Sequence, residues 1–329
     1  MKKPMHLSLL VPDGQSNLST IACLVGAYEI FTTANNFWQE KGNEPNFQIE
    51  LVGTSDQTEV HGLFSVKAQV HIDQVKRTDL IIIPSLARNY EEAVGGNRLL
   101  INWIATQYRV GAEVASICTG AFMLASSGLL DGANCATHWS AAATFRSRFP
   151  EVNLQADTLI TDEKGIYTNG GAYSFLNLVI YLVEKYYDRE TAIYCSKIFQ
   201  VEMDRYSQSE FIIFKGQKEH GDDVVKKAQQ VLESNLHDKI SIDELCDQFS
   251  VSRRNFDRRF IKATGNTPLE YSQRVKIEIA KKSFETTRKT ISEVMYEVGY
   301  SDDKAFREVF KKFTSMSPID YKKKYNKEA

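Results

Sequence analysis

The last third of this chain contains an internal repeat. Residues 241–271 align with residues 290–321 at an offset of 49, which becomes 50 after one extra residue near Lys304. Self-similarity at a fixed period is the signature of a supersecondary unit that occurs more than once. We therefore expect two copies of one small unit, packed into a single C-terminal domain.

Both copies begin with the sequence pattern of a helix start. Ser241 with Glu244, and Thr290 with Glu293, have the spacing of a capping box, in which the hydroxyl accepts a backbone N–H and the carboxylate reaches back. Apolar residues then recur at helical spacing: Ile242, Leu245, Cys246 and Phe249, and Ile291, Val294, Met295 and Val298. Each copy is predicted to open with a short amphipathic helix.

A second helix is predicted after a tight turn in each copy, with Ser252 and Ser301 as its N-caps. Its buried side would carry an aromatic pair: Phe256 and Phe260 in the first copy, Phe306 and Phe310 in the second. A proline at the first helical position, Pro268 or Pro318, then starts a third helix, which in the first copy extends over residues 268–286. Helix, turn and helix, twice over, predict a doubled helix-turn-helix.

The polar side of each second helix carries the residues that would contact DNA. They are Arg253, Arg254, Asn255, Arg258 and Arg259 in the first copy, and Asp302, Asp303, Lys304, Arg307, Lys311 and Lys312 in the second. Arginine matches guanine, asparagine matches adenine, and arginine also holds phosphate. Because two acids at the start of the second copy's helix would repel phosphate, we expect the first unit to carry more of the base readout. The alternative is that these charges only solvate a helical bundle.

Charge is distributed unevenly along the chain. Residues 1–221 carry 18 Lys and Arg against 24 Asp and Glu, net −6, whereas residues 222–329 carry 22 against 18, net +4. A basic C-terminal third on an acidic body indicates an anionic partner at that end. A polar stretch with two glycines predicts a linker at 204–221, between an N-terminal domain at 1–203 and a DNA-binding domain at 222–329.

Composition narrows the class of protein. Hydrophobic residues make up 43% and charged residues 25%, which is typical of globular domains. No apolar run approaches the roughly 18 residues of a membrane helix. The five cysteines are widely spaced and include no CxxC pair, so neither a disulfide framework nor a metal site is expected, and a reducing cytoplasm fits.

The C-terminal third resembles the DNA-binding domain of the AraC/XylS family over about residues 222–326. The resemblance rests on the segments 252–260, 263–268, 276–280 and 298–302. The chain departs from the family pattern at Lys276, where arginine is usual, and at Ser315, where glycine is usual. The resemblance implies two units in successive major-groove segments, joined rigidly by the 268–286 helix, and a homodimer on direct-repeat sites of double-stranded DNA.

The N-terminal two thirds alternate between strands and helices. The segments 7–11, 48–52 and 80–83 read as strands, and 19–35, 98–108 and 175–187 read as helices. This alternation predicts an α/β sandwich with a mainly parallel sheet. The fold class is therefore an α/β domain followed by an all-α domain.

One strand is predicted to run directly into Cys118, with a helix starting at once and Gly120 allowing close backbone approach. This is the geometry of a nucleophile elbow. A thiol at a helix N-terminus is expected to have a lowered pKa. The alternative is that Cys118 is an ordinary small buried hydrophobe.

His138 lies 20 residues after Cys118, and the combination resembles the PfpI type of the class I glutamine amidotransferase-like superfamily. The resemblance covers roughly residues 5–200 and implies that the cysteine and histidine face each other at the strand ends. More narrowly, the domain order resembles the branch fused to an AraC-type domain. Two departures matter: Cys23 stands at the position of the usual acid, and Ser85 stands where glycine is usual after Pro84.

The sequence thus predicts a cytoplasmic transcription regulator that is controlled by a small metabolite. The metabolite is expected to bind at the C-terminal ends of the strands, where open α/β sheets hold ligands, and the resemblance implies that the regulator is an activator. The candidate ligand-binding residues are Cys23, Ser85, Cys118, Thr119, His138, Asn169, Gly170 and Gly171. The resemblance points to amino acids, betaines or related nitrogen compounds, and we expect no cofactor. Two alternatives stay open: a hydrolase with Cys118 as nucleophile and His138 as base, and a structural dimerisation domain without a ligand.

Overall fold

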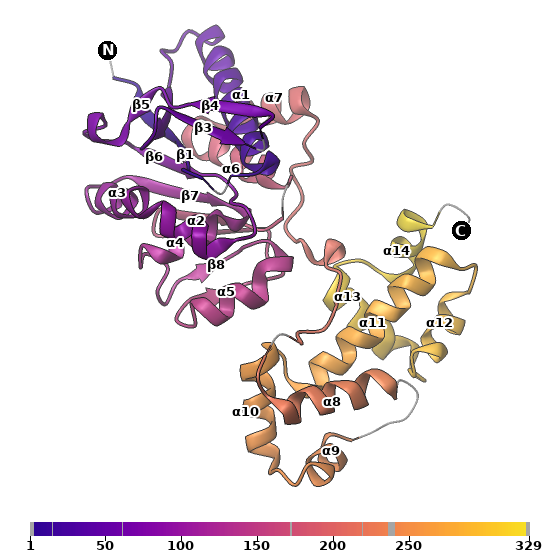
Figure 1. The fold of residues 1–329 in the computed structure, drawn as a ribbon. Coiled ribbons are helices and arrows are strands. Elements are labelled where there is room, and N and C mark those ends of the chain that lie inside the picture. Colours follow the sequence, from indigo (N-terminus) through magenta and orange to yellow (C-terminus); the bar gives the residue numbers. More distant parts are fainter. Residues whose placement is uncertain are drawn as a thin grey trace. The chain divides into compact units, whose positions relative to one another are not determined.

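The structure is a computed structural model that describes residues 3–14, 16–60, 62–171, 173–218, 220–235 and 241–326. The chain divides into two compact units, Met1–Gln208 and Ser209–Ala329 (Figure 1). The segment 204–221, which the sequence indicates as a linker, is shared between them.

The first unit is built on a seven-stranded sheet in the order β10-β11-β7-β6-β1-β2-β5. The strands are β1 (Met5–Val11), β2 (Phe47–Gly53), β5 (Val70–His71), β6 (Leu80–Ile83), β7 (Glu113–Ile117), β10 (Ile160–Glu163) and β11 (Ile166–Asn169). All neighbours pair in parallel except β10 and β11. The predicted mainly parallel α/β fold is confirmed.

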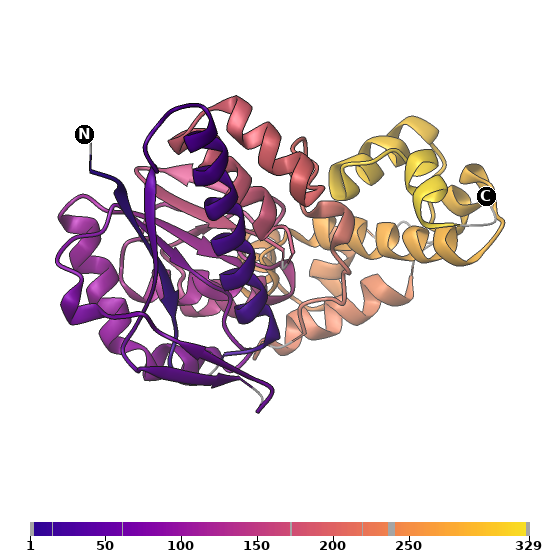
Figure 2. The ribbon, with the colours of Figure 1, turned by 90° about the horizontal axis from the view of Figure 1, so that it is seen from above.

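Helices cover both faces of this sheet (Figures 1 and 2). One face carries α1 (Leu18–Glu40), α6 (Phe175–Tyr186) and α7 (Arg189–Phe199); the other carries α2 (Tyr90–Gly96), α3 (Arg98–Arg109), α4 (Ala121–Ser126) and α5 (Ala142–Arg148). Two small pairs, β3 (Gln57–Val60) with β4 (Phe64–Lys67) and β8 (Asn134–Cys135) with β9 (Asn153–Leu154), lie outside the main sheet. In the described parts of the chain, no helix is long and apolar enough to cross a bilayer.

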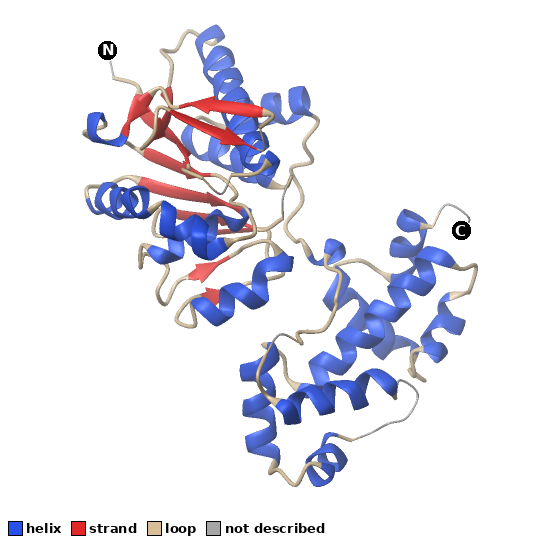
Figure 3. Cartoon of the chain, in the orientation of Figure 1, coloured by secondary structure: helices blue, strands red, loops and turns tan. Residues whose placement is uncertain are grey.

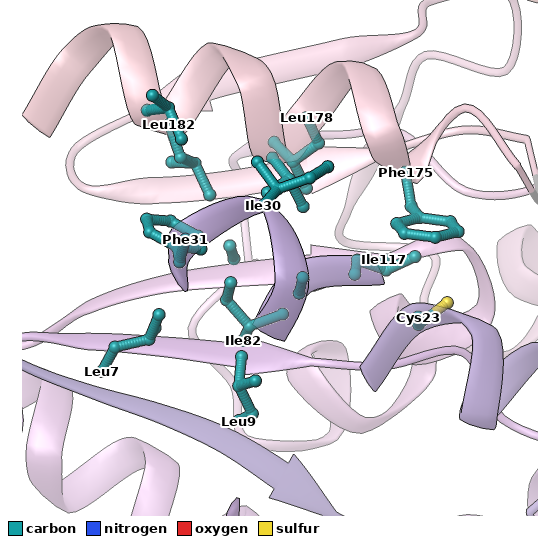
Figure 4. Packing of buried hydrophobic residues seen from close by; sticks show 14 of the residues in the cluster. Leu7, Leu9, Cys23, Ile30, Phe31, Ile82, Ile117, Phe175, Leu178 and Leu182 are labelled. Atoms are coloured by element: carbon teal, nitrogen blue, oxygen red, sulfur yellow. The ribbon is translucent and has the colours of Figure 1, made fainter. Parts of the chain in front are cut away.

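The two cores follow from the alternation of side chains along each strand. On β6, Leu80 and Ile82 face the helices α1 and α6, whereas Ile81 and Ile83 face the opposite core. Figure 4 shows the first core, in which side chains of α1 and α6 pack onto those of β1 and β6. A continuous apolar run such as β6 is therefore explained by burial on both faces.

The second unit consists of helices (Figure 3). They are η4 (Ser209–Phe211), α8 (Asp223–Ser234), α9 (Ile242–Gln248), α10 (Arg253–Thr264), α11 (Pro268–Thr286), α12 (Ile291–Glu297), α13 (Asp303–Thr314) and α14 (Pro318–Tyr325). The predicted helix at 268–286 has the predicted ends. The predicted aromatic pairs on α10 and α13 are fully buried, each at the centre of its own core.

The helix starts in the repeat are largely those the sequence predicts. Ser241 and Thr290 each form a full capping box, and Ser252 is the N-cap of α10. The N-cap of α13 is Asp302, not Ser301. Because the second copy has one extra residue here, the position four residues before its first buried phenylalanine moves from Ser301 to Asp302.

Each helix-turn-helix unit contains two residues in the left-handed backbone region. At the turn between the first and second helices these are Ser250 (φ 52°) and Gly299 (φ 76°). After the second helix they are Gly265 (φ 70°) and Ser315 (φ 59°). Each copy thus fills one of the two positions with serine, whose Cβ makes this conformation unfavourable.

Replacing Ser250 or Ser315 with glycine is expected to stabilise the second unit by about 1 kcal/mol each, because the strain of the left-handed conformation is relieved. The gain should appear as a higher melting temperature of that unit in calorimetry. The reverse changes, Gly265→Ser and Gly299→Ser, serve as matched controls and are expected to destabilise it. A loss of stability in both serine-to-glycine variants would contradict this explanation.

Candidate functional site

The predicted elbow at Cys118 is present. Strand β7 ends at Ile117, and the short helix η2 (Cys118–Gly120) leads directly into α4. Cys118 has a φ of 56°, which is rare for a residue with a side chain. A Cβ on Gly120 would lie 2.6 Å from the Pro84 carbonyl oxygen, so the chain needs glycine there.

The expected lowering of the Cys118 pKa is wrong. Its side chain is buried, with 5% of the residue exposed, and this burial raises the pKa of the thiol to about 12, with the neighbouring Cys23 adding to the effect. Hydrogen bonding from Thr119 acts in the opposite direction but is the smaller influence. The effect of desolvation on the pKa is therefore larger than the opposite effect expected from the helix N-terminus, and Cys118 is a protonated thiol at neutral pH.

Alkylation of Cys118 by iodoacetamide in the native protein is expected to be at least about tenfold slower than that of a free thiol at pH 8, because only the thiolate reacts. Since the folded pKa lies above the ordinary value of 9.0, the unfolded chain ionises first as the pH rises. The stability associated with the neutral thiol is thus complete below pH 9 and is lost above it. Mass spectrometry of time-resolved labelling measures the alkylation rate of Cys118, and rapid labelling at pH 7 would contradict the expected slow reaction.

Cys23, Ser85 and Thr119 line the buried surroundings of the elbow. The Thr119 hydroxyl donates to the Leu86 carbonyl and accepts from the Leu86 N–H, both at 2.8 Å. The Cys23 and Ser85 side chains meet at 3.8 Å, and burial raises the pKa of Cys23 to about 11. At the position of Cys23, where the family pattern has a carboxylate, this chain therefore has a second neutral thiol.

His138 does not pair with Cys118. Its Nδ1 contacts the Ser140 backbone N–H at 3.1 Å and the Ser140 hydroxyl at 2.8 Å, as the N-cap of η3 (Trp139–Ala141). Burial, together with the positive charge of Arg88, lowers the pKa of His138. Among the residues described, no hydrogen bond joins this ring to the thiol.

The turn after β11 is held by its own side chains. Asn169 is fully buried and its Nδ2 donates to the carbonyls of Leu159 and Ser174 at 3.2 Å. The Gly171 carbonyl accepts from the Ser174 hydroxyl at 2.7 Å. Asn169 thus shapes the turn, and Gly170 and Gly171 form its backbone.

Sequence reasoning did not single out three residues that bear on the surroundings of the elbow. Arg88 follows β6 and is exposed, and no acid in the described part of the chain forms an ion pair with it. Thr137 and Gln208 are fully buried polar residues. Arg88 could have been found from its position just after Pro84, whereas nothing in the sequence connects Gln208 with Thr137.

The cysteines and histidines in the described part of the chain are not grouped into a metal centre. All five cysteines are free and buried. In the ranges that the structure describes, no three His, Cys, Asp or Glu residues are placed to hold a metal ion.

The candidate DNA-contacting residues of α10 differ in what they contact. Arg254 is exposed and has no partner among the described side chains, and Arg258 donates to Asn255 at 3.1 Å. Arg253 bonds to Asp243 and Asp257. Arg259 holds both oxygens of Asp222, at 2.8 and 2.7 Å. This last pair gives Arg259 a structural role, which the sequence did not indicate.

On α13, Lys304 and Lys311 are exposed, and neither pairs with an acid in the described segments. Arg307 is bound to Asp303 one turn earlier, at 2.6 Å, and Lys312 reaches Glu270 on α11 at 3.4 Å. Asp302 is occupied as the N-cap and accepts from the Ala305 N–H. The two acids of α13 are therefore partly neutralised within the helix itself.

Comparisons with known proteins agree with this two-part structure. The model of the DJ-1/PfpI family matches residues 20–185, half of the chain, and a helix-turn-helix domain model matches residues 245–324. A solved structure from Vibrio parahaemolyticus shares the fold of the first unit, with 24% identity, 60% of this chain and 99% of that chain covered, and a TM-score of 0.53. A ThiJ/PfpI family protein from Pseudomonas syringae matches with 16% identity, 71% and 87% coverage, and a TM-score of 0.51.

Among curated proteins, the chain is similar to the HTH-type transcriptional regulators GbdR and ArgR of Pseudomonas aeruginosa. It is 26% identical to GbdR over 67% of this chain and 60% of that protein. It is also 26% identical to ArgR over 64% of each chain. The match thus spans less than two thirds of the length of either relative. Since the DJ-1/PfpI family model covers half of the sequence, the chain belongs to the DJ-1/PfpI family. An AraC-type helix-turn-helix domain follows the DJ-1/PfpI domain in the sequence.

Proposed function

We propose that this protein is a transcription regulator that binds double-stranded DNA through its second unit and responds to a small metabolite in its first. The observation that carries the proposal is the free basic side chains on the second helices of both units: Arg254 on α10 and Lys304 and Lys311 on α13. Long side chains without partners can bond to phosphate and base edges without breaking an existing ion pair. The protein would act in the cytoplasm as a homodimer.

The two units are assigned different parts in DNA binding. Arg254, Arg258 and Asn255 on α10 offer the donors and acceptors that recognise guanine and adenine in the major groove. Lys304 and Lys311 on α13 are point charges suited to phosphate. Phosphate contacts position a protein on the duplex, whereas base contacts supply sequence preference.

The effector would lie beside the elbow, where Arg88 supplies an unpaired positive charge. The positive charge of Arg88 contributes to the lowered pKa of His138, which indicates that Arg88 lies in the neighbourhood of the elbow. A guanidinium binds a carboxylate through two parallel hydrogen bonds. An amino acid or a betaine, each of which carries a carboxylate, is therefore the class we propose.

DNA binding is tested by selecting duplexes from a random library with the purified full-length protein and measuring affinity against salt. Log Kd is expected to rise steeply with log salt, by about 0.9 for each phosphate neutralised. Enrichment of no sequence, together with a flat salt response, would overturn the proposal. Sedimentation with and without the selected duplex tests the homodimer, and a monomer under both conditions would exclude it.

Effector binding is tested by thermal-shift measurements with a panel of amino acids and betaines on the wild type, Arg88→Ala and the charge-matched control Arg98→Ala. A ligand at 100 times its Kd should stabilise the first unit by about 2.7 kcal/mol. Arg88→Ala is expected to weaken binding about tenfold or more, and Arg98→Ala to leave it unchanged. Binding that is unaffected by Arg88→Ala would exclude the proposed carboxylate contact.

The structure supports the hydrolase alternative less well than it supports the regulator. The elbow itself supports it, but the buried neutral thiol and the His138 ring bound to Ser140 do not provide a nucleophile with a base. We expect Cys118→Ser to leave DNA binding intact. Turnover of an amide or ester substrate that Cys118→Ser abolishes would reinstate the hydrolase.

A further inference from the structure

The last residue of the first unit, Gln208, is fully buried in that unit. Its side-chain amide nitrogen donates to the carbonyls of Ala156 at 2.8 Å, Thr137 at 2.9 Å and Thr158 at 3.3 Å. A glutamine immediately before a domain boundary would ordinarily be exposed to water. Here it is a deeply placed anchor.

The surrounding backbone is shaped to hold this side chain. A Cβ on Gly170 would lie 2.5 Å from the Gln208 amide nitrogen, so glycine leaves open the space that the amide occupies, which we call the notch. The main chain is also fixed, because the Gln208 N–H donates to the Asp157 carbonyl at 3.1 Å and the Leu159 N–H donates to the Tyr206 carbonyl at 3.2 Å.

Gln208 is connected to the elbow by two hydrogen bonds. Thr137, whose carbonyl accepts from Gln208, donates its own hydroxyl to the Cys118 carbonyl at 2.9 Å. Thr137 also precedes His138 in the chain. Any displacement of the elbow that moves Thr137 therefore alters an acceptor of the Gln208 amide.

The Gln208 side chain has one hydrogen-bond acceptor without a partner. Its Oε1 is buried and has no hydrogen-bond partner, although buried polar atoms are nearly always bonded. When the amide lies in the notch, one of its hydrogen-bonding atoms is therefore unsatisfied. This lowers the stability of that arrangement relative to one in which Gln208 leaves the notch. A two-state element requires two arrangements that differ little in free energy, and an unsatisfied buried oxygen in one of them reduces that difference.

The segment that follows Gln208 belongs to the second unit and is bound to its helices. Glu210 pairs with Lys324 of α14 at 2.7 Å. The Ile212 carbonyl accepts from Lys281, and the Phe214 N–H donates to Glu278 at 3.1 Å. Gln208 therefore directly precedes a segment that is bound to the helices of the DNA-binding unit.

We propose that Gln208 is the positioning residue that transmits the state of the elbow site to the DNA-binding unit, with its amide held in the notch in one state and released in the other. This inference rests on the proposed function, because it specifies how that regulator is controlled. It requires that a change at the elbow alters DNA affinity, and that the alteration passes through Gln208.

A double-mutant cycle tests the proposal without an effector. Thr137→Val keeps the side-chain shape but removes the hydroxyl that bonds to Cys118, and DNA affinity is measured with a duplex selected by the wild-type protein. We expect Thr137→Val to change the Kd about fivefold or more in the wild type, and by less than about twofold in Gln208→Met. Ser207→Ala, which removes the bond from the neighbouring hydroxyl to the Asp157 carbonyl, is the control background and should preserve the full effect.

An unchanged Kd in Thr137→Val, or an equal change in the Gln208→Met background, would overturn the inference. Failure of the wild type to bind any duplex would instead overturn the proposed function. Since Gln208→Met could fail to fold, hydrogen exchange in the wild-type background gives a second measurement. Thr137→Val should speed exchange of the Gln208 and Leu159 amides, and unchanged exchange there would also reject the proposal.

Discussion

Replacing Arg254 and Arg258 together with alanine is expected to weaken binding of a selected duplex by about 100-fold or more, since each bidentate arginine–guanine contact contributes about 1–3 kcal/mol. Both side chains are exposed on α10, so their removal does not disturb the core around Phe256 and Phe260. Sequence preference should relax at the contacted base pairs, and competition with mutated duplexes measures this.

A charge-matched control separates base contacts from general attraction. Lys227→Ala with Lys282→Ala also removes two positive charges, from the exposed surfaces of α8 and α11. This control should weaken binding by less than about threefold and leave sequence preference unchanged. Equal losses in the two double variants would mean that α10 contributes only charge.

Gly120→Ala is expected to destabilise the first unit by about 3 kcal/mol, the upper part of the range for overpacking. The new Cβ would lie 2.6 Å from the Pro84 carbonyl oxygen and 2.9 Å from that of Ile83. Both are backbone atoms of β6 or its end, which cannot rotate away as a side chain would. All three tryptophans, Trp38, Trp103 and Trp139, belong to the first unit, so urea unfolding followed by tryptophan fluorescence reports on this unit.

Gly95→Ala is the matched control. Gly95 lies within α2, and a Cβ there would meet no atom within 4 Å. Alanine should therefore stabilise the first unit by about 0.5–1 kcal/mol through its higher helix propensity. A mild effect of Gly120→Ala, similar in size to that of Gly95→Ala, would show that the elbow can move away from β6.

Structural features that depend on residues close together in the sequence could be predicted from the sequence. The capping boxes at Ser241 and Thr290, and the helix from Pro268 to Thr286, depend on residues within one turn of each other. The elbow at Cys118 was likewise predictable, because an apolar strand followed by a glycine-containing helix start is a local pattern. The one shifted cap, Asp302, was missed because the buried phenylalanines of α13 set its register.

The two domains, the parallel α/β fold and the doubled helix-turn-helix could be predicted from the sequence, since hydrophobic periodicity and capping residues act over short distances along the chain. The chemistry of the site depends on contacts that form only when the chain is folded. Burial beside Cys23 keeps Cys118 protonated, Asp222 occupies Arg259, and Thr137 receives the amide of Gln208. These partners lie 37 to 95 residues apart in the sequence (259 − 222 and 118 − 23), and desolvation and charge depend on which side chains the fold brings together.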